Sequence, residues 1–372
     1  AAQADGERRT MLINVGPQHP STHGVFHALV HLDGETILKV DPVIGYLHRN
    51  HEKIYEGMTY PQIVPITDRL DYIGPLSNEL VYCMAVEKLV GIEVPERAQY
   101  LRVIFVELNR ILSHLLYVGS IALDLAGYQP FLLCWRDREL GYDLLDKAAG
   151  QRMFPNYIRI GGVHNDVPEG WFEELLGLLA YLETEAWPEY KTLWMENVIF
   201  KSRSIGVGVL TREAAADYGV TGPVARASGI DRDLRKDRPY LVYDRLQFDK
   251  VLGSKGDVYE RTWMRMYEIL ESIKIIRQAV AQIPDGPVLG GLPRGVLKAA
   301  KGAEVYTVIE GPRGENGIYI YSDGGIHPYR IHARSAPYVH LQLLDPLSRG
   351  EKIADMIANL ASFDPVMGDV DR

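Results

Sequence analysis

The sequence predicts an α+β fold, in which a central bundle of long helices lies between a small N-terminal antiparallel sheet and a group of C-terminal strands. Two patterns support this prediction. Near both ends of the chain, apolar and polar residues alternate as in strands with one buried face, whereas through the middle they recur at helical spacing. The chain has 372 residues, of which 47% are hydrophobic and 24% are charged. It can therefore bury a sizeable core, and disorder is excluded.

The N-terminal sheet is predicted from residues 11–43. The strand-like runs there are MLINV, VFHALVHL and TILKV, and Asp33 and Gly34 form a turn between the last two. The pattern becomes helical at about Asn78, and it continues through the long segments 95–125 and 130–150. These segments predict the first helices of the bundle.

Two further long helices are predicted over residues 168–200 and 257–283, with Asp166 and Asp257 as their N-terminal caps. The stretch 206–256 between them is rich in Gly, Arg and Asp and has few apolar runs. We expect it to form ordered loops on the surface of the bundle.

After a link rich in Pro and Gly, three alternating runs predict a hairpin and a third strand: EVYTVIEG, NGIYIYSDGG and YRIHARS. A last helix, GEKIADMIANLAS, leads into DPVMGDVDR. We therefore expect three regions. Residues 1–77 hold the N-terminal sheet and loops, 78–283 the helical bundle with its inserted loops, and 284–372 the C-terminal strands and helix.

Composition excludes several classes of function. The 40 basic and 49 acidic residues give a net charge of −9, which argues against a nucleic-acid partner. The two cysteines, Cys83 and Cys134, cannot form a disulfide framework or a local set of thiolates for zinc or an iron–sulfur cluster. If electrons pass through this protein, another chain must carry the cluster. No stretch approaches the ~20 apolar residues that a membrane helix requires.

Three segments contain residues that suit chemistry. The first is GPQHPSTHG, residues 16–24, in which two prolines and two glycines fix the backbone around His19 and His23. Such a loop can hold an imidazole at a set position. The same pattern is also typical of a tight connection with ordinary surface histidines, and the segment alone does not decide between the two.

The second segment is the long helix of residues 95–125, where polar residues recur at helical spacing among apolar ones. Buried charges are costly unless they are paired, so these side chains must meet partners from other elements or line a wet cavity. For Glu107 and Arg110 we expect a network that ties the bundle helices together. The full set is Glu107, Arg110, His114, Tyr117 and Asp124.

The third segment is TDRLDYIG, residues 67–74, in which Tyr72 can donate a proton or a hydrogen bond. With 22 tyrosines in the chain, a single tyrosine is weak evidence. The sequence lacks a nucleophile elbow, a Walker loop, a dinucleotide fingerprint and a zinc-binding helix pair, so the usual hydrolytic and nucleotide-dependent classes are not indicated.

Taken together, the motifs resemble the 49-kilodalton subunit family of respiratory complex I. They follow one another in the family's order: GPQHPSTHG, IGYLHRNHEK, TDRLDYIG, ELNRILSHLL, LDLAGYQPF, NYIRIGGV and DPVMGDVDR. The resemblance runs from about Leu12 to Arg372. It implies the fold of the nickel–iron hydrogenase large subunit, to which that family is similar.

In those hydrogenases, four cysteines in the patterns R-x-C-G-x-C and D-P-C-x-x-C hold the metal. Laid on these patterns, the sequence has Asp71 and Gly74 at the first pair of positions and Val366 and Asp369 at the second. A nickel–iron centre needs thiolate ligands, so hydrogenase activity is excluded. The resemblance implies instead that these four residues line the inner end of a quinone cavity.

In the family, a loop histidine and a tyrosine hydrogen-bond the quinone headgroup, and an aspartate backs the histidine. The matching residues here are His23, Tyr72 and Asp124. Reduction of a quinone by two electrons also needs two protons, which a tyrosine and a histidine can supply through hydrogen bonds already in place. The resemblance thus implies that these three residues are catalytic.

The electrons would come from a 4Fe–4S cluster in a neighbouring small subunit, and Arg49 and Arg69 match positions beside that cluster. A fixed positive charge there would stabilise the reduced cluster. Many members have a histidine where this sequence has Phe154, so we expect the cluster potential to depend less on pH here. This would suit a low-potential quinone such as menaquinone.

The resemblance also implies three partner chains: the cluster-bearing small subunit, a 30-kilodalton-type subunit of the peripheral arm and the membrane subunit that forms the quinone channel. The complex would be a proton-translocating NADH:quinone oxidoreductase, with this chain in the peripheral arm on the cytoplasmic face of the inner (plasma) membrane, or on the matrix side in mitochondria. Two alternatives stay open: a ferredoxin- or deazaflavin-dependent relative of this complex, and a non-catalytic scaffold.

Overall fold

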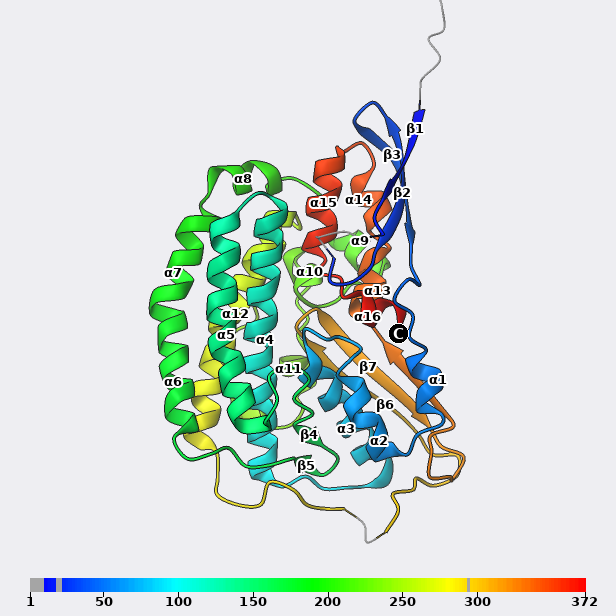
Figure 1. The fold of residues 1–372 in the computed structure, drawn as a ribbon, viewed down its shortest axis with the longest axis vertical. Helices are drawn as coiled ribbons and strands as arrows, with labels where there is room; N and C mark the ends of the chain where they lie inside the picture. Colours follow the sequence, from blue (N-terminus) through cyan, green and yellow to red (C-terminus); the bar gives the residue numbers. More distant parts are fainter. Residues whose placement is uncertain (1–9, 18–21, 293–294) are drawn as a thin grey trace, which may run out of the picture.

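The computed structural model describes residues 10–17, 22–292 and 295–372. Long helices form a bundle on one side of the molecule, and two three-stranded antiparallel sheets lie on the other side (Figure 1). Short C-terminal helices lie between the N-terminal sheet and the bundle (Figure 1). This arrangement confirms the predicted α+β class.

The N-terminal sheet has the predicted strands in the order β1 (Thr10–Val15), β2 (His27–Asp33) and β3 (Thr36–Val43). Strand β2 alternates between buried and partly buried residues, as a strand with one covered face must. Its buried face shares a hydrophobic core with two of the C-terminal helices, α14 (Leu344–Ser348) and α15 (Ile353–Ser362). The sheet is thereby fixed to the opposite end of the chain.

Two helices follow the N-terminal sheet where the sequence predicted loops: α1 (His51–Tyr55) and α2 (Tyr60–Thr67). Helix α2 begins with a capping box between Thr59 and Gln62. Both helices are too short for apolar periodicity to reveal them, which is why the sequence pattern missed them. Helix α3 (Pro75–Val90) begins slightly before the predicted start, because Pro75 suits the first turn of a helix.

The bundle is built around α4 (Glu96–Asp124), α5 (Tyr128–Ala149) and α12 (Val258–Gln282). Asp257 caps α12 as predicted, because its Oδ1 accepts a hydrogen bond from the Glu260 N–H at 2.8 Å. Asp166 does not cap the helix predicted over residues 168–200. It pairs instead with Arg97 at 2.8 Å.

The helix predicted over residues 168–200 is interrupted. It consists of α6 (Trp171–Tyr181), α7 (Trp187–Tyr190) and α8 (Val198–Ser204), with π-helical turns at Leu182–Ala186 and Lys191–Met195. Pro188 has no N–H to donate within a helix, and the π-helical turns lie on both sides of it. Asn197 then caps α8 through its side-chain oxygen.

The stretch 206–256 is more regular than predicted, because it contains three short α-helices, α9 (Arg212–Asp217), α10 (Gly222–Ala227) and α11 (Leu234–Asp237), and a 3₁₀-helix at Tyr243–Arg245. Thr211 and Asp233 cap α9 and α11 through their side chains. Side-chain caps thus start helices in a stretch with few apolar runs.

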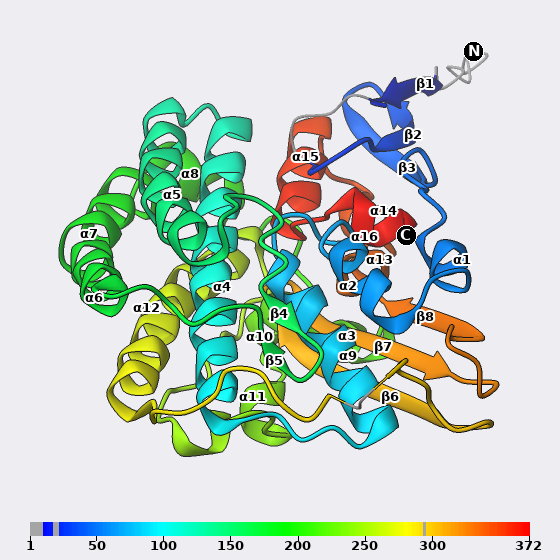
Figure 2. The ribbon, with the colours of Figure 1, turned by 60° about the horizontal axis from the view of Figure 1, so that its bottom comes forward.

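The second sheet has the order β6 (Glu304–Gly311), β7 (Gly314–Tyr321) and β8 (Arg330–Arg334), which confirms the predicted hairpin and third strand. Helix α3 packs across β6 and β7 (Figure 2). A small hairpin, β4 (Ile158–Arg159) with β5 (Gly162–Val163), lies beside α3 and α4, and α13 (Ala336–Leu341) and α16 (Met367–Asp371) complete the fold.

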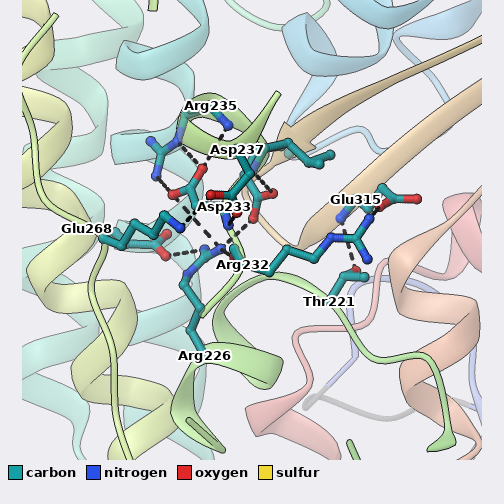
Figure 3. Close-up of polar contacts among 12 residues, drawn as sticks. Thr221, Arg226, Arg232, Asp233, Arg235, Asp237, Glu268 and Glu315 are labelled. Carbon is teal, nitrogen blue, oxygen red and sulfur yellow. Dashed lines mark hydrogen bonds and ion pairs between the residues drawn. The ribbon is translucent and has the colours of Figure 1, made fainter. Parts of the chain in front are cut away.

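Buried ion pairs join the bundle to the loops and the second sheet. Glu107 on α4 contacts Arg110 at 3.1 Å and Arg235 on α11 at 3.2 Å, and it accepts a hydrogen bond from the Ser272 hydroxyl of α12 at 2.6 Å, which confirms the predicted structural network. Burial opposes the ionisation of Glu107, but these two arginines outweigh it and lower its pKa. The network continues to Arg226, whose guanidinium points toward Glu268 on α12 (Figure 3).

Replacing Arg226 by Met should strongly destabilise the chain. Arg226 lies 2.5 Å from Glu268 and 2.7 Å from Glu310, and the variant leaves both carboxylates buried without this partner. We expect a loss of roughly 3–5 kcal/mol in the free energy of unfolding, measured by denaturant titration. The control is Lys147→Met, which removes an exposed pair with Glu174 and should cost less than about 1 kcal/mol. Equal losses in the two variants would contradict this account.

Candidate functional site

Backbone pairing joins the His23 loop to the C-terminal motif. The His23 N–H donates to the Pro365 carbonyl at 3.1 Å, and the Met367 N–H donates to the His23 carbonyl at 2.8 Å, so that His23 and Val366 form an isolated parallel bridge. His19, the other histidine of this loop, lies outside the described residues. The bridge places an imidazole beside a segment that is remote in sequence.

Tyr72 lies against the same loop. It follows α2 and precedes α3, and its hydroxyl donates a hydrogen bond to the His23 carbonyl. Two glycines make room for its ring: a Cβ at Gly24 would lie 2.6 Å from the Tyr72 hydroxyl, and a Cβ at Gly368 would lie 2.7 Å from its Cε1. Burial, followed by the negative charge of Asp71, raises the pKa of Tyr72 to about 12. The two predicted proton donors therefore lie together.

Asp364 contacts His23, at 3.0 Å from Nε2. The role of Asp124, the residue that the motifs match to this position, stays a prediction. Asp124 is the last residue of α4. The bridge to Val366 explains the contact with Asp364, because it sets His23 beside the residues that immediately precede Val366. Asp364 is the first residue of the motif DPVMGDVDR, so the sequence did contain a signal for it.

Arg313 connects the two acidic segments of the site. It lies in the turn between β6 and β7, where its Nη1 is 2.7 Å from Asp71 and its Nε is 3.2 Å from Asp364. Burial opposes ionisation of Asp364, but the Arg313 guanidinium outweighs it and, with His23, lowers the pKa of Asp364 to about 2. No sequence pattern pointed to Arg313, because its partners are distant in the chain.

The four positions that match hydrogenase cysteines lie around this ion pair. Asp71 also accepts hydrogen bonds from the backbone N–H groups of Ile73 and Gly74, at 3.1 and 2.9 Å. Val366 is fully buried in a small apolar cluster with Ile73 and Leu116. Asp369 accepts a hydrogen bond from the Ser335 hydroxyl at 2.6 Å. Within the described ranges, no group of three or more His, Cys, Asp or Glu side chains is arranged to hold a metal ion.

We call the set formed by His23, Tyr72, Asp71, Asp364, Asp369 and Arg313 the His23–Tyr72 site. The two predicted cluster-proximal arginines lie next to it. Arg49 donates to the carbonyl of Arg69, and the Arg69 guanidinium lies 4.7 Å from the centre of the Phe154 ring. Positive charge is thus held at one side of the site.

Hollows also occur elsewhere on the chain. One cavity of about 500 Å³ is formed by α2, the β4–β5 hairpin and the link before β6, and Val64, Ile160 and Leu289 are among its lining residues. It contains none of the residues of the His23–Tyr72 site. Among the described helices, none combines the length and the apolar character needed to cross a membrane.

Comparisons with known proteins agree with this description. The family model described as respiratory-chain NADH dehydrogenase, 49 Kd subunit, matches residues 124–301 and 292–372. An NADH-quinone oxidoreductase subunit of Clostridium beijerinckii is 50% identical over 362 residues, which cover 97% of each chain. The corresponding NADH-quinone oxidoreductase subunit of Geobacillus thermodenitrificans is 49% identical over 362 residues, which cover 97% of this chain and 98% of that protein.

The fold and the site, with these likenesses, define one subunit of a multisubunit oxidoreductase. The chain belongs to the family of the 49-kilodalton subunit of respiratory-chain NADH dehydrogenase.

The Asp364 ion pair should make stability depend on pH. Because the folded-state pKa of about 2 is below the ordinary value of 3.8, the pair stabilises the fold above about pH 4, and this contribution is lost as the pH falls toward 2. Asp364→Asn should reduce the free energy of unfolding at neutral pH, and on the order of 2 kcal/mol of that difference should disappear by pH 2. Denaturant titrations at several pH values measure it. The exposed Asp217→Asn is the control, and equal pH profiles for Asp364→Asn and the unchanged chain would refute the assignment.

Proposed function

We propose that this chain forms the inner end of the quinone site in a proton-pumping NADH:quinone oxidoreductase, and that His23 and Tyr72 hold and protonate the quinone headgroup. One observation carries the proposal most directly. The Tyr72 hydroxyl donates to the backbone carbonyl of His23, 49 residues earlier in the chain, and a buried carboxylate contacts the imidazole of the same histidine. The curated relatives are named NADH-quinone oxidoreductases, which agrees with quinone as the substrate.

His23 supplies one proton. Its Nε2 contacts Asp364 at 3.0 Å, which leaves Nδ1 as the ring atom that can reach a quinone oxygen. A protonated imidazole carries a proton on each nitrogen, so it can donate to Asp364 and to the quinone at once. When the Nδ1 proton leaves, the hydrogen bond from Nε2 to Asp364 still holds the ring in place.

Tyr72 supplies the second proton. Its hydroxyl donates to the His23 carbonyl, and rotation of the O–H bond redirects that hydrogen to a quinone oxygen. Its pKa of about 12 keeps it protonated at neutral pH. The phenolate that remains after proton transfer is unfavourable beside Asp71, so a proton must return to it before the next turnover.

The apolar part of the quinone ring needs an apolar wall. Val366, Ile73 and Leu116 form such a wall, with Trp135 of α5 packed against it. In this proposal, Asp71, Gly74, Val366 and Asp369 thus surround the headgroup. Asp124, at the C-terminal end of α4, stays a predicted catalytic residue.

Electrons reach the quinone from a 4Fe–4S cluster in the neighbouring small subunit. The cysteines of this chain are both buried and far apart in sequence, and Arg49 and Arg69 put positive charge where a reduced cluster is stabilised. The phenyl ring of Phe154 cannot take up a proton, which is why we propose a weak pH dependence of the cluster potential and a low-potential quinone such as menaquinone.

The chain would pair with the small subunit, with a 30-kilodalton-type subunit of the peripheral arm and with the membrane subunit that forms the quinone channel. It would lie on the cytoplasmic face of the plasma membrane, or on the matrix side in mitochondria. Residues of these partners would close the quinone space around the His23–Tyr72 site.

Tyr72→Phe tests the proposal in the assembled complex. Loss of the donor should lower quinone reduction tenfold or more, which is a loss of roughly 1.4 kcal/mol of transition-state stabilisation. Electron flow to an artificial acceptor upstream of the quinone should not change. The matched control is Tyr329→Phe, which alters a tyrosine that is 63% exposed. If Tyr72→Phe reduces quinone at the normal rate, Tyr72 only packs, and the scaffold alternative is favoured.

A further inference from the structure

Three buried carboxyl groups converge at the His23–Tyr72 site. Asp71 and Asp364 are each 1% exposed, and Asp369 is 3% exposed. Placing several carboxylates together away from water is costly unless cations balance them. The partners of each carboxyl group therefore decide which of the three stays ionised.

The three carboxyl groups have different partners. Arg313 contacts Asp71 at 2.7 Å and Asp364 at 3.2 Å, so its charge is already engaged by two carboxylates. Among the described residues, no cationic group lies within ion-pair distance of Asp369, and its contact is the neutral hydroxyl of Ser335 at 2.6 Å. A buried carboxyl group with no cation in contact favours its protonated form.

More distant charges do not change this conclusion. Arg372 lies 3.8 Å from Glu52 and donates to the Ala333 carbonyl at 3.0 Å, so it has partners of its own. The groups with the largest electrostatic effect on Asp369 are Asp71 before α3, Arg313 between β6 and β7 and Arg372 at the chain end, and Tyr55 on α1 also interacts with it. Arg49 and Tyr72 lie against the neighbouring Gly368.

We propose that Asp369 is a proton store for the His23–Tyr72 site, which holds a proton at neutral pH and returns it to Tyr72 after Tyr72 has protonated the quinone. Burial, followed by the negative charge of Asp71, raises the pKa of Asp369 to about 7, in agreement with its contacts. The proposal rests on the proposed function, because it names the group that refills the tyrosine.

The step balances without any additional reactant. The Tyr72 O–H bond breaks and its proton moves to a quinone oxygen, while the electrons come from the cluster. The Asp369 O–H bond then breaks, its proton forms a new O–H bond on the Tyr72 phenolate, and a proton from the bulk solvent later restores the Asp369 carboxyl group. Because the pKa of Tyr72 is about 12 and that of Asp369 is about 7, this second transfer runs toward Tyr72.

The backbone next to Asp369 lies against the Tyr72 ring. Asp369 directly follows Gly368, and a Cβ at Gly368 would lie only 2.7 Å from Cε1 of Tyr72. Glycine at this position lets the backbone that carries Asp369 lie directly against the tyrosine ring.

Infrared difference spectroscopy of the assembled complex, titrated with acid and base, detects the stored proton. We expect a carboxylic-acid C=O band that titrates near neutral pH and is absent from Asp369→Asn. Ser335→Ala removes a hydrogen bond that favours ionisation, so it should move the midpoint of the band to higher pH. Burial also raises the pKa values of Asp68 and Glu79, which share a hydrogen bond, but their bands occur in every variant and cancel in the comparison.

Quinone reduction by the same variants measures the role of the proton. In the unchanged complex, the rate should fall as the pH rises through the titration of Asp369. Asp369→Asn should be slower by about tenfold or more at low pH and should lack this part of the pH profile, while Asp369→Glu should restore it. Electron flow to the upstream acceptor should be unaffected in each variant.

The outcomes separate this inference from the proposed function. A C=O band that survives Asp369→Asn, or a midpoint that does not move in Ser335→Ala, would overturn the proton store. A quinone-reduction profile that Asp369→Asn leaves unchanged would also overturn it, even if Tyr72→Phe still blocks the reaction. If Tyr72→Phe is fully active, the proposed function fails, whereas the infrared band still reports the protonation of Asp369.

Discussion

A single buried guanidinium holds together the segments that form the His23–Tyr72 site. Arg313 contacts Asp71, 242 residues away in sequence, and Asp364, 51 residues away. Tyr72 follows Asp71 directly, and Asp364 contacts His23. Removing one partner of such a buried pair leaves an uncompensated charge, which costs several kcal/mol. The positions of both proposed proton donors therefore depend on this ion pair.

The same constraint organises the rest of the chain. Every charge on the buried face of α4 needs a partner, and Arg235 of α11 contacts Glu107 there, while Glu268 of α12 lies 2.8 Å from His114. The pairs that Arg235 and Arg226 form with the bundle fix the region between α8 and α12 against it, although that region has few apolar runs of its own. Around the site the charges are not fully balanced, and this imbalance is what makes Asp369 able to hold a proton.

Local patterns predicted the elements that extend over many residues. The alternation in β2 and the helical periodicity of α4 and α12 need only neighbouring residues, and Asp257 was recognised as a cap for the same reason. The interruption around Pro188 was missed because the apolar spacing hardly changes where α-helical turns become π-helical. The short helices were missed because a helix needs more residues before the helical spacing of its apolar residues can be recognised.

The site could be predicted only in part. His23 and Tyr72 were recognised through whole motifs, since neither residue is distinctive alone, and the structure places them in contact. The contact between His23 and Asp364 depends on a backbone bridge between distant segments, and the role of Arg313 depends on a turn in the second sheet. Such contacts leave no periodic trace in the sequence.

The most direct test of this account is a structure of the assembled complex with a short-chain quinone bound. We predict that one quinone oxygen lies between about 2.6 and 3.2 Å from the Tyr72 hydroxyl and the other lies at a similar distance from His23 Nδ1. The ring should rest against Val366. A headgroup that contacts neither His23 nor Tyr72, for example one bound in the cavity beside Leu289, would contradict the account.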